Sequence, residues 1–342
     1  MFALKNDVSY KVFQMKDVNT SEWDQFLERS FIPYRVENNL SYGKLMSDLG
    51  CDVNQVVFYM ANEPLAYCIL VNDQVKPVQV FSLAVNKKGE ENISVILEAL
   101  SRFINRQGFP VIFYPYFFLK DYKLKHLLKL HYTVSVVDLN LNWNFESLRK
   151  KIKYEIRKSI KSNTVVRIAE TYDEWKAFYQ VVLNHSNVRG YDPQLTLKKL
   201  KGLYDLYLEG KFLCMIALKE GKCVGGLILA LHSAKGGRLV LLSASIDETK
   251  NGVEYHLLHE TILHLKKLGL EFFDLDGLPA RYSRLSGIRE FKLKFGHEEL
   301  LPIYFNRNLH SFRLYLVRFF MENEFVLKVL KHIRNCRSKI GK

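Results

Sequence analysis

A lysine flanked by apolar residues is the most suggestive feature of the chain. The run from Gly287 to Gly296 reads GIREFKLKFG and sets Lys292 between Phe291 and Leu293. Apolar neighbours exclude water and strengthen the field of a cation. Such a cation could stabilise the oxyanion of an acyl transfer, where one donor contributes roughly 3–4 kcal/mol. The alternative is a surface lysine on an amphipathic segment, which the residue types alone favour.

Three further charged side chains could do chemistry. Asp274 and Asp276, in FDLDG, follow an apolar strand pattern and could act as a base or orient an amine. A strand-end Asp that caps the next turn is the alternative. Arg189, in HSNVRGYD, carries the planar guanidinium that matches phosphate oxygens. Its alternative is a salt bridge with Asp192.

Histidines in the run HLLHETILH do not have zinc-ligand spacing. Zinc proteases place two histidines four residues apart on one helix face. Here His259 and His264 are five apart, and the closer pair of His256 and His259 has no third ligand in view. We therefore expect no metal site.

The elements that must position these residues repeat a β-β-β-α-β order, with helices ahead of it each time. This order matches the N-acetyltransferase-like (GNAT) fold, so we expect an α/β protein with two tandem GNAT-like domains, mixed sheets and no long coiled-coil arm. The expected limits are 1–146 for the first domain, 147–306 for the second with its linking basic helix, and 307–342 for a tail. The expected helices are 20–30, 41–49, 93–108, 121–130, 172–185, 195–209 and 253–269, and the expected strands are 55–60, 65–71, 78–85, 111–117, 134–141, 211–218, 224–231, 238–246 and 271–276.

The phosphate-binding loop of acetyl-CoA enzymes is degenerate in both halves. That loop holds phosphates with backbone N–H groups at a helix start. The matching run DETKNGVEY keeps Gly252 but lacks the rest of the motif, and NKKGEENIS in the first half lacks it too. A CoA donor held in the ordinary way is therefore disfavoured.

The charge of the chain favours a polyanionic partner, because Lys and Arg number 50 against 36 Asp and Glu. The segment 147–161 is dense in cations, and its apolar residues Leu148, Ile152, Ile156 and Ile160 recur every four positions. This spacing predicts a helix with one buried stripe and a basic outer face. That face is either simply solvated or contacts RNA through Lys150, Lys151, Lys153 and Lys158.

The tail 307–342 alternates apolar and basic residues at helical spacing. It either packs on the second domain or anchors the protein to an anionic membrane surface. No apolar run has the length of a membrane helix, and the N-terminal residues lack the pattern of a signal peptide. The five cysteines are scattered, as in a reducing compartment. We therefore expect a cytoplasmic protein, with peripheral contact at the inner face of the membrane if the tail is an anchor.

Four segments together resemble the Fem family of peptidoglycan aminoacyltransferases, which carry two GNAT-like domains. The run EIRKS at 155–159, after Asp138-Leu139 and before Val165-Val166, is similar to the family's linking helix. HSNVRGYD resembles its arginine segment, and GLEFFDLDG resembles its Asp-containing strand with Asp276 where a small residue is usual. GIREFKLKFG resembles its Gly-Ile-x-x-Phe-Lys-x-x-Phe-Gly signature.

The resemblance implies an enzyme that moves an amino acid from aminoacyl-tRNA onto an amine of a phosphorylated bacterial cell-wall precursor, with no cofactor beyond the donor. It favours Lys292, Phe291 and Asp274 as catalytic, and Arg189 and Asp276 as substrate-binding. The family's early phosphate-binding lysine motif is altered here to Tyr42 and Gly43, with Lys44 nearby. The acceptor therefore stays open. One alternative is a GNAT-fold N-acyltransferase with an acyl-CoA or acyl-carrier donor acting on a nucleotide- or lipid-linked sugar. Another is a non-catalytic RNA- or lipid-binding protein.

Overall fold

The computed structural model describes residues 8–306 apart from 31–34, 74–77, 82, 116–118, 123, 142, 144, 194, 233–234, 281–282 and 284. The chain forms two compact units that alternate along the sequence. Unit 1 comprises Met1–Ile32, Cys51–Ser135 and Gly277–Lys342, and unit 2 comprises Pro33–Gly50 and Val136–Asp276. The expected domain limits stay a prediction, and the expected tail 307–342 lies outside the described residues.

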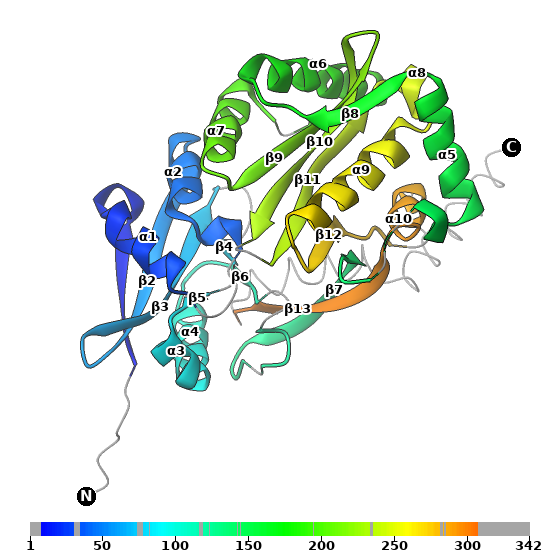
Figure 1. Cartoon of the computed structure of the whole chain (residues 1–342). Coiled ribbons are helices and arrows are strands. Elements are labelled where there is room, and N and C mark those ends of the chain that lie inside the picture. Colours follow the sequence, from blue (N-terminus) through cyan, green and yellow to red (C-terminus); the bar gives the residue numbers. More distant parts are fainter. Residues whose placement is uncertain are drawn as a thin grey trace, which may run out of the picture. The chain divides into compact units, whose positions relative to one another are not determined.

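Unit 2 has the GNAT-like order of elements (Figure 1). Its sheet runs β12-β11-β10-β9-β8. Neighbouring strands are antiparallel except for the parallel pair β11 and β12. The strands are β8 (Thr164–Ile168), β9 (Phe212–Lys219), β10 (Lys222–His232), β11 (Gly236–Ala244) and β12 (Phe272–Gly277), and the helices are η2 (Val36–Asn38), α2 (Leu40–Asp48), η4 (Phe145–Ser147), α5 (Lys150–Lys161), α6 (Tyr172–Arg189), α7 (Leu197–Leu208), α8 (Ile246–Thr249) and α9 (Val253–Lys267).

Helices cover both faces of the unit 2 sheet because successive strand residues point to opposite sides. On one face, Ile228 and Ala230 join the core formed with Phe178 of α6 and Leu203 of α7. On the other face, α9 packs so closely that a Cβ at Gly225 would touch the side chain of Val253. Helix α5 packs on α9.

Unit 1 repeats the order with a second core (Figure 1). Its strands follow the order β1-β2-β3-β4-β6-β13, with β5 paired to β3. Helix α4 covers one face, and Trp23 of α1 contacts Tyr67 on β3. The strands are β1 (Ser9–Gln14), β2 (Asp52–Met60), β3 (Glu63–Asn72), β4 (Val78–Phe81), β5 (Ala84–Val85), β6 (Val111–Tyr114) and β13 (His297–Phe305), and the helices are η1 (Met15–Asp17), α1 (Thr20–Glu28), α3 (Lys87–Glu91), α4 (Ile93–Asn105) and α10 (Ser286–Lys292). Strand β7 (Leu128–Asp138) runs from unit 1 into unit 2.

The predicted α/β architecture of two GNAT-like domains is confirmed, and the longest helix among the described residues is α6, with 18 residues. One predicted helix, near 121–130, is wrong. There the described residues before Leu128 lie in turns and irregular backbone, His126 has a positive φ of 70° that interrupts any helix, and β7 begins at Leu128. Leu124 and Leu127 are nevertheless buried in the core of unit 1, which explains their helix-like spacing.

Candidate active site

The sheet of unit 2 opens where β11 and β12 separate. These parallel strands pair at only three positions, of which the last joins Arg238 to Asp274. Beyond it, β11 continues to Ala244 and β12 to Gly277. In unit 1, by contrast, all four residues of β4 pair with β6. The carboxyl ends of parallel strands are where α/β proteins bind ligands. The fork beside Arg238 and Asp274 is therefore the candidate site of unit 2.

Asp274 is a buried carboxyl at this fork, with 1% of the residue exposed. Its Oδ1 accepts a hydrogen bond of 2.7 Å from the backbone N–H of Asp276. Asp274 therefore caps the turn after the strand, as one of the two interpretations predicted. Asp276 itself is exposed and has a φ of 68°. Burial, together with the charge of Asp276, raises the pKa of Asp274 to about 6. Asp274 therefore combines a turn-capping role with titration near neutral pH.

Glu37 forms a buried ion-pair cluster with two arginines behind the fork. Its carboxylate receives two hydrogen bonds from Arg35, of 3.1 and 2.8 Å, and a third from Arg238. Only 1% of the Glu37 side chain and 21% of the Arg238 side chain are exposed. Burial alone would raise the pKa of Glu37, but the charges of Arg238 and Arg35 hold it well below its usual range. Arg238, at the fork, is thus paired with Glu37, whose carboxylate stays ionised.

A histidine completes the cluster. His232, at the end of β10, is fully buried, and its Nδ1 accepts a hydrogen bond of 3.1 Å from the backbone N–H of Val36. Burial lowers the pKa of His232 well below its ordinary value, so the ring is neutral at pH 7. Residues 35–40 are all buried, and this bond ties them to the sheet of unit 2.

Sequence reasoning did not identify this cluster. Arg35 and Glu37 lie in the polar run RVENN, which gives no periodicity that would mark it as buried. The one usable signal was Arg238, a charged residue directly before the apolar run LVLL.

Lys292 is the last residue of α10, and its side chain is anchored within unit 1. Its Nζ donates a hydrogen bond of 2.9 Å to the carbonyl oxygen of Gly277, the residue that follows Asp276 in the chain. The backbone oxygen of Lys292 accepts a hydrogen bond of 3.2 Å from Ser135 Oγ. Phe291 packs edge-on against Phe295 with ring centroids 5.7 Å apart. Lys292 is therefore a half-buried, positioned ammonium group rather than a fully solvated surface lysine.

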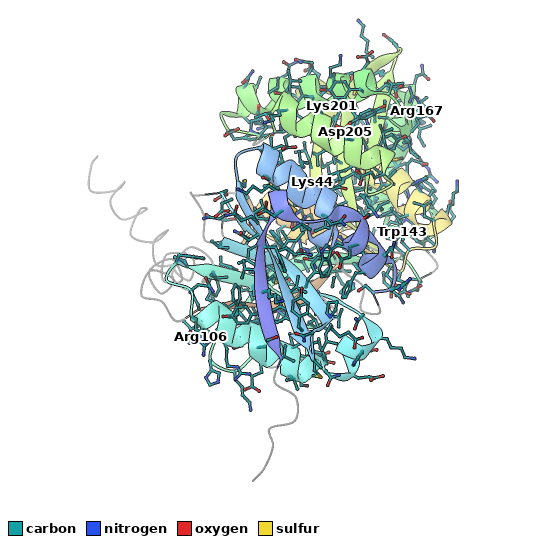
Figure 2. All side chains as sticks on the ribbon, turned by 90° about the vertical axis from the view of Figure 1, so that its left-hand side faces the viewer. Lys44, Arg106, Trp143, Arg167, Lys201 and Asp205 are labelled. Atoms are coloured by element: carbon teal, nitrogen blue, oxygen red, sulfur yellow. The ribbon has the colours of Figure 1, made fainter. Side chains whose placement is uncertain are left out.

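Three predicted substrate-binding residues lie on unit 2. Arg189 ends α6 and is exposed. Burial raises the pKa of Glu254, and the charge of Arg189 offsets part of that increase. Tyr42 on α2 stacks on Phe212, with ring planes 13° apart, and so belongs to the core. Lys44 is exposed on the same helix (Figure 2). None of these positions tests the binding roles, which stay predictions.

The predicted RNA-contacting lysines divide into two kinds. Lys150 and Lys151 are exposed on α5. Lys153 forms a salt bridge of 3.1 Å with Glu146, and Lys158 donates a hydrogen bond of 2.5 Å to the carbonyl oxygen of Lys250. The latter two are therefore engaged within the protein.

The start of α9, where acetyl-CoA enzymes hold phosphates, lies against the backbone of α5. Gly252 precedes the helix with a φ of 77°, and a Cβ there would overlap the carbonyl oxygen of Glu155. A carbonyl oxygen repels phosphate, so this approach to the helix start is unsuited to an anion.

Two histidines of α9 are packing residues. His256 is buried, and its Nδ1 lies 3.1 Å from Ser159 Oγ on α5. His259 packs against Phe145. Burial lowers the pKa of both rings, and that of His256 falls to about 4. The described part of the chain contains no group of three or more side chains arranged to hold a metal ion. It also contains no helix long and apolar enough to cross a membrane.

Comparisons with known proteins identify the fold. No family model and no curated protein sequence matches the chain. Among solved structures, FemX has a TM-score of 0.63 at 10% identity, covering 89% of this chain and 99% of its own. L-PGS from Bacillus licheniformis has a TM-score of 0.60 at 12% identity, covering 90% and 98%. The C-terminal domain of a putative lysylphosphatidylglycerol synthetase from Agrobacterium fabrum has a TM-score of 0.57 at 15% identity, covering 88% and 97%. The chain therefore has the Fem-like double GNAT fold over most of its length.

Proposed function

We propose that this protein is an acyltransferase that moves an aminoacyl group from aminoacyl-tRNA onto an amine of a peptidoglycan precursor or a related cell-envelope intermediate. The observation that carries the proposal is the anchored ammonium of Lys292, 2.9 Å from the carbonyl oxygen of Gly277. Support comes from the Fem-like fold, which this chain shares with FemX, with L-PGS and with the C-terminal domain of a putative lysylphosphatidylglycerol synthetase.

The chemistry needs a cation for the oxyanion and a group that takes a proton from the attacking amine. Lys292 supplies the cation, and we assign to Phe291, the residue before it, the role of limiting the access of water. Asp276 is exposed and attracts the amine while it is still an ammonium ion. The new amide bond forms as the ester bond between the amino acid and the terminal ribose of the tRNA breaks. Asp274, with its pKa raised to about 6 by burial, is suited to accept the proton that the amine releases and to pass it to the departing ribose oxygen.

Arg189, Lys44 and Tyr42 are the proposed contacts to the acceptor. Arg189 presents an exposed guanidinium to a phosphate group of the acceptor. Lys44 adds a second cation, and Tyr42 contributes the edge of its half-buried ring. These roles suit an acceptor that carries pyrophosphate, which also agrees with the excess of 14 positive charges.

The start of α9 supports an RNA donor over acyl-CoA. The backbone of Glu155 covers Gly252 where CoA enzymes present N–H groups to pyrophosphate. The proposed donor is therefore a co-substrate, and no further cofactor is required. A cytoplasmic location, with peripheral contact at the inner face of the membrane, would bring the enzyme to a lipid-linked acceptor.

A transfer assay with charged tRNA tests the proposal. Labelled amino acid on a bacterial tRNA pool is offered together with nucleotide-linked and lipid-linked cell-wall precursors. We expect RNase-sensitive transfer that Lys292→Met lowers by about a hundredfold or more. Lys294→Met is the matched control, because Lys294 lies two residues away and is also half-buried. Transfer from labelled acetyl-CoA in place of tRNA would refute the proposed donor.

A further inference from the structure

The outer face of helix α5 is a surface dense in cations. No acidic side chain is exposed between residues 149 and 161, and Glu155, the one acid of the helix, is half-buried. We call this surface the α5 face. Its exposed side chains are Arg149, Lys150, Lys151, Tyr154, Arg157, Ile160 and Lys161.

An aromatic ring lies among these cations. Tyr154 is 61% exposed. Three cations share its side of the helix. Lys150 lies four residues before Tyr154, Lys151 lies three residues before it, and Arg157 lies three residues after it. The Arg157 guanidinium is itself held over the ring of Phe145, 5.1 Å from its centroid. An exposed ring beside positioned cations is the combination that binds bases and phosphates of RNA.

The apolar stripe of α5 argues against a membrane as the partner. Helices that bind at a lipid surface insert an apolar face into the bilayer. Ile152 and Ile156 of α5 are already buried, as is Leu148 just before the helix. Helix α5 packs on α9 of its own unit, so this stripe is not available to lipid. What remains outside is charge, one aromatic ring and Ile160.

We infer that the α5 face binds the sugar–phosphate backbone of the donor RNA, with Tyr154 stacking on an unpaired base. This inference rests on the proposed function, because it assigns a surface to the tRNA donor. It also changes the predicted set of contacts. Lys153 and Lys158, bonded within the protein, are replaced by Arg149, Arg157 and Lys161.

Direct binding of deacylated tRNA to the full-length chain tests the inference without any transfer reaction. Fluorescence anisotropy is recorded over a range of salt concentrations. For Lys150→Glu/Lys151→Glu we expect affinity to fall about tenfold or more, and the slope of log affinity against log salt to become shallower by about two. The matched control is Lys16→Glu/Lys87→Glu on unit 1, which changes the net charge equally at two exposed lysines. We expect it to bind within about twofold of the parent.

Substitutions of the ring separate stacking from general attraction. Tyr154→Ala should weaken binding about tenfold, whereas Tyr154→Phe keeps the ring and should bind normally. Because all these side chains are exposed, each variant should melt like the parent protein. The RNA affinity of each Lys→Glu variant is compared with that of the corresponding Lys→Gln variant, so that a loss caused by a folding defect is recognised.

Three outcomes would overturn the inference. The first is equal loss in the α5 and control variants, which would mean attraction by net charge alone. The second is unchanged RNA binding in the α5 variants. The third is that the α5 variants lose binding to phosphatidylglycerol vesicles and still bind RNA, which would make the α5 face a membrane-binding surface. If the protein bound tRNA through the α5 face but transferred no amino acid, the proposed function would be refuted and the RNA-binding surface would stand.

Discussion

Replacing Asp274 with asparagine should make the protein more stable at neutral pH and less active. Asparagine has the shape of a protonated aspartic acid, and its Oδ1 can still accept the hydrogen bond from the N–H of Asp276. The substitution therefore removes the buried charge and retains the cap. Stability gained by removing a side chain's charge is expected where that charge is kept for function.

The expected gain follows from the raised pKa. Burial and Asp276 move the pKa of Asp274 from 3.8 to about 6. Between these values the folded state binds more protons than the unfolded state, so the wild type loses stability as pH rises. With a shift of about two pKa units, the buried charge lowers the free energy of unfolding of the wild type by about 3 kcal/mol above pH 6. The loss is about half of that at pH 5 and almost nothing below pH 3.

Urea unfolding of the two proteins from pH 3 to pH 8 measures this difference. We expect the variant and the wild type to unfold together at pH 3 and the variant to be the more stable at pH 8. A variant that is less stable by the same amount at every pH would refute the reasoning. Asp274 would then serve as a structural partner of Arg238, and its carboxyl would not be a neutral-pH acid.

Three further outcomes are expected. Glu37→Gln removes the anion that pairs the buried guanidinium of Arg35 and the half-buried one of Arg238, and should destabilise the protein by about 3–5 kcal/mol in urea unfolding; a loss below about 1 kcal/mol would show that the cluster is well hydrated. Gly252→Ala introduces both left-handed strain and overlap with Glu155, whereas Gly210→Ala, at a φ of 70° with no atom within 4 Å, introduces the strain alone. We expect thermal melts to show that Gly252→Ala is less stable than Gly210→Ala by about 1–3 kcal/mol. Equal stability of the two variants would contradict the close packing of α5 on α9. In a pH–rate profile, Asp274→Asn should remove an inflection near the pKa of about 6; an inflection that persists would assign it to another group.

Helices and strands with strong periodicity were predictable, and the exceptions have physical reasons. The four-residue spacing on α5 predicted a buried stripe that includes Ile160, but Ile160 is 51% exposed and Ser159 is buried instead. Four residues turn a helix by about 400°, so each step drifts by about 40°. By Ile160 the drift has rotated the side chain away from α9, and Ser159 meets His256.

The candidate site was predictable only in part. Asp274 could be found because it ends an apolar strand pattern. Lys292 could be singled out because it interrupts an apolar pattern, and its role stays a prediction. The cluster around Glu37 could not, because a buried ion pair forms between residues 201 positions apart. Nothing in the run RVENN distinguishes it from a surface loop until the pairing of β11 and β12 places Arg238 at the fork.

The most direct test of the account is aminoacyl transfer from charged tRNA to cell-wall precursors, measured for the parent protein, Lys292→Met and Lys294→Met. We predict RNase-sensitive transfer that falls about a hundredfold or more in Lys292→Met and is retained in Lys294→Met. Transfer that is equal in all three proteins, or absent with every charged tRNA, would contradict the assignment of Lys292 and the RNA donor.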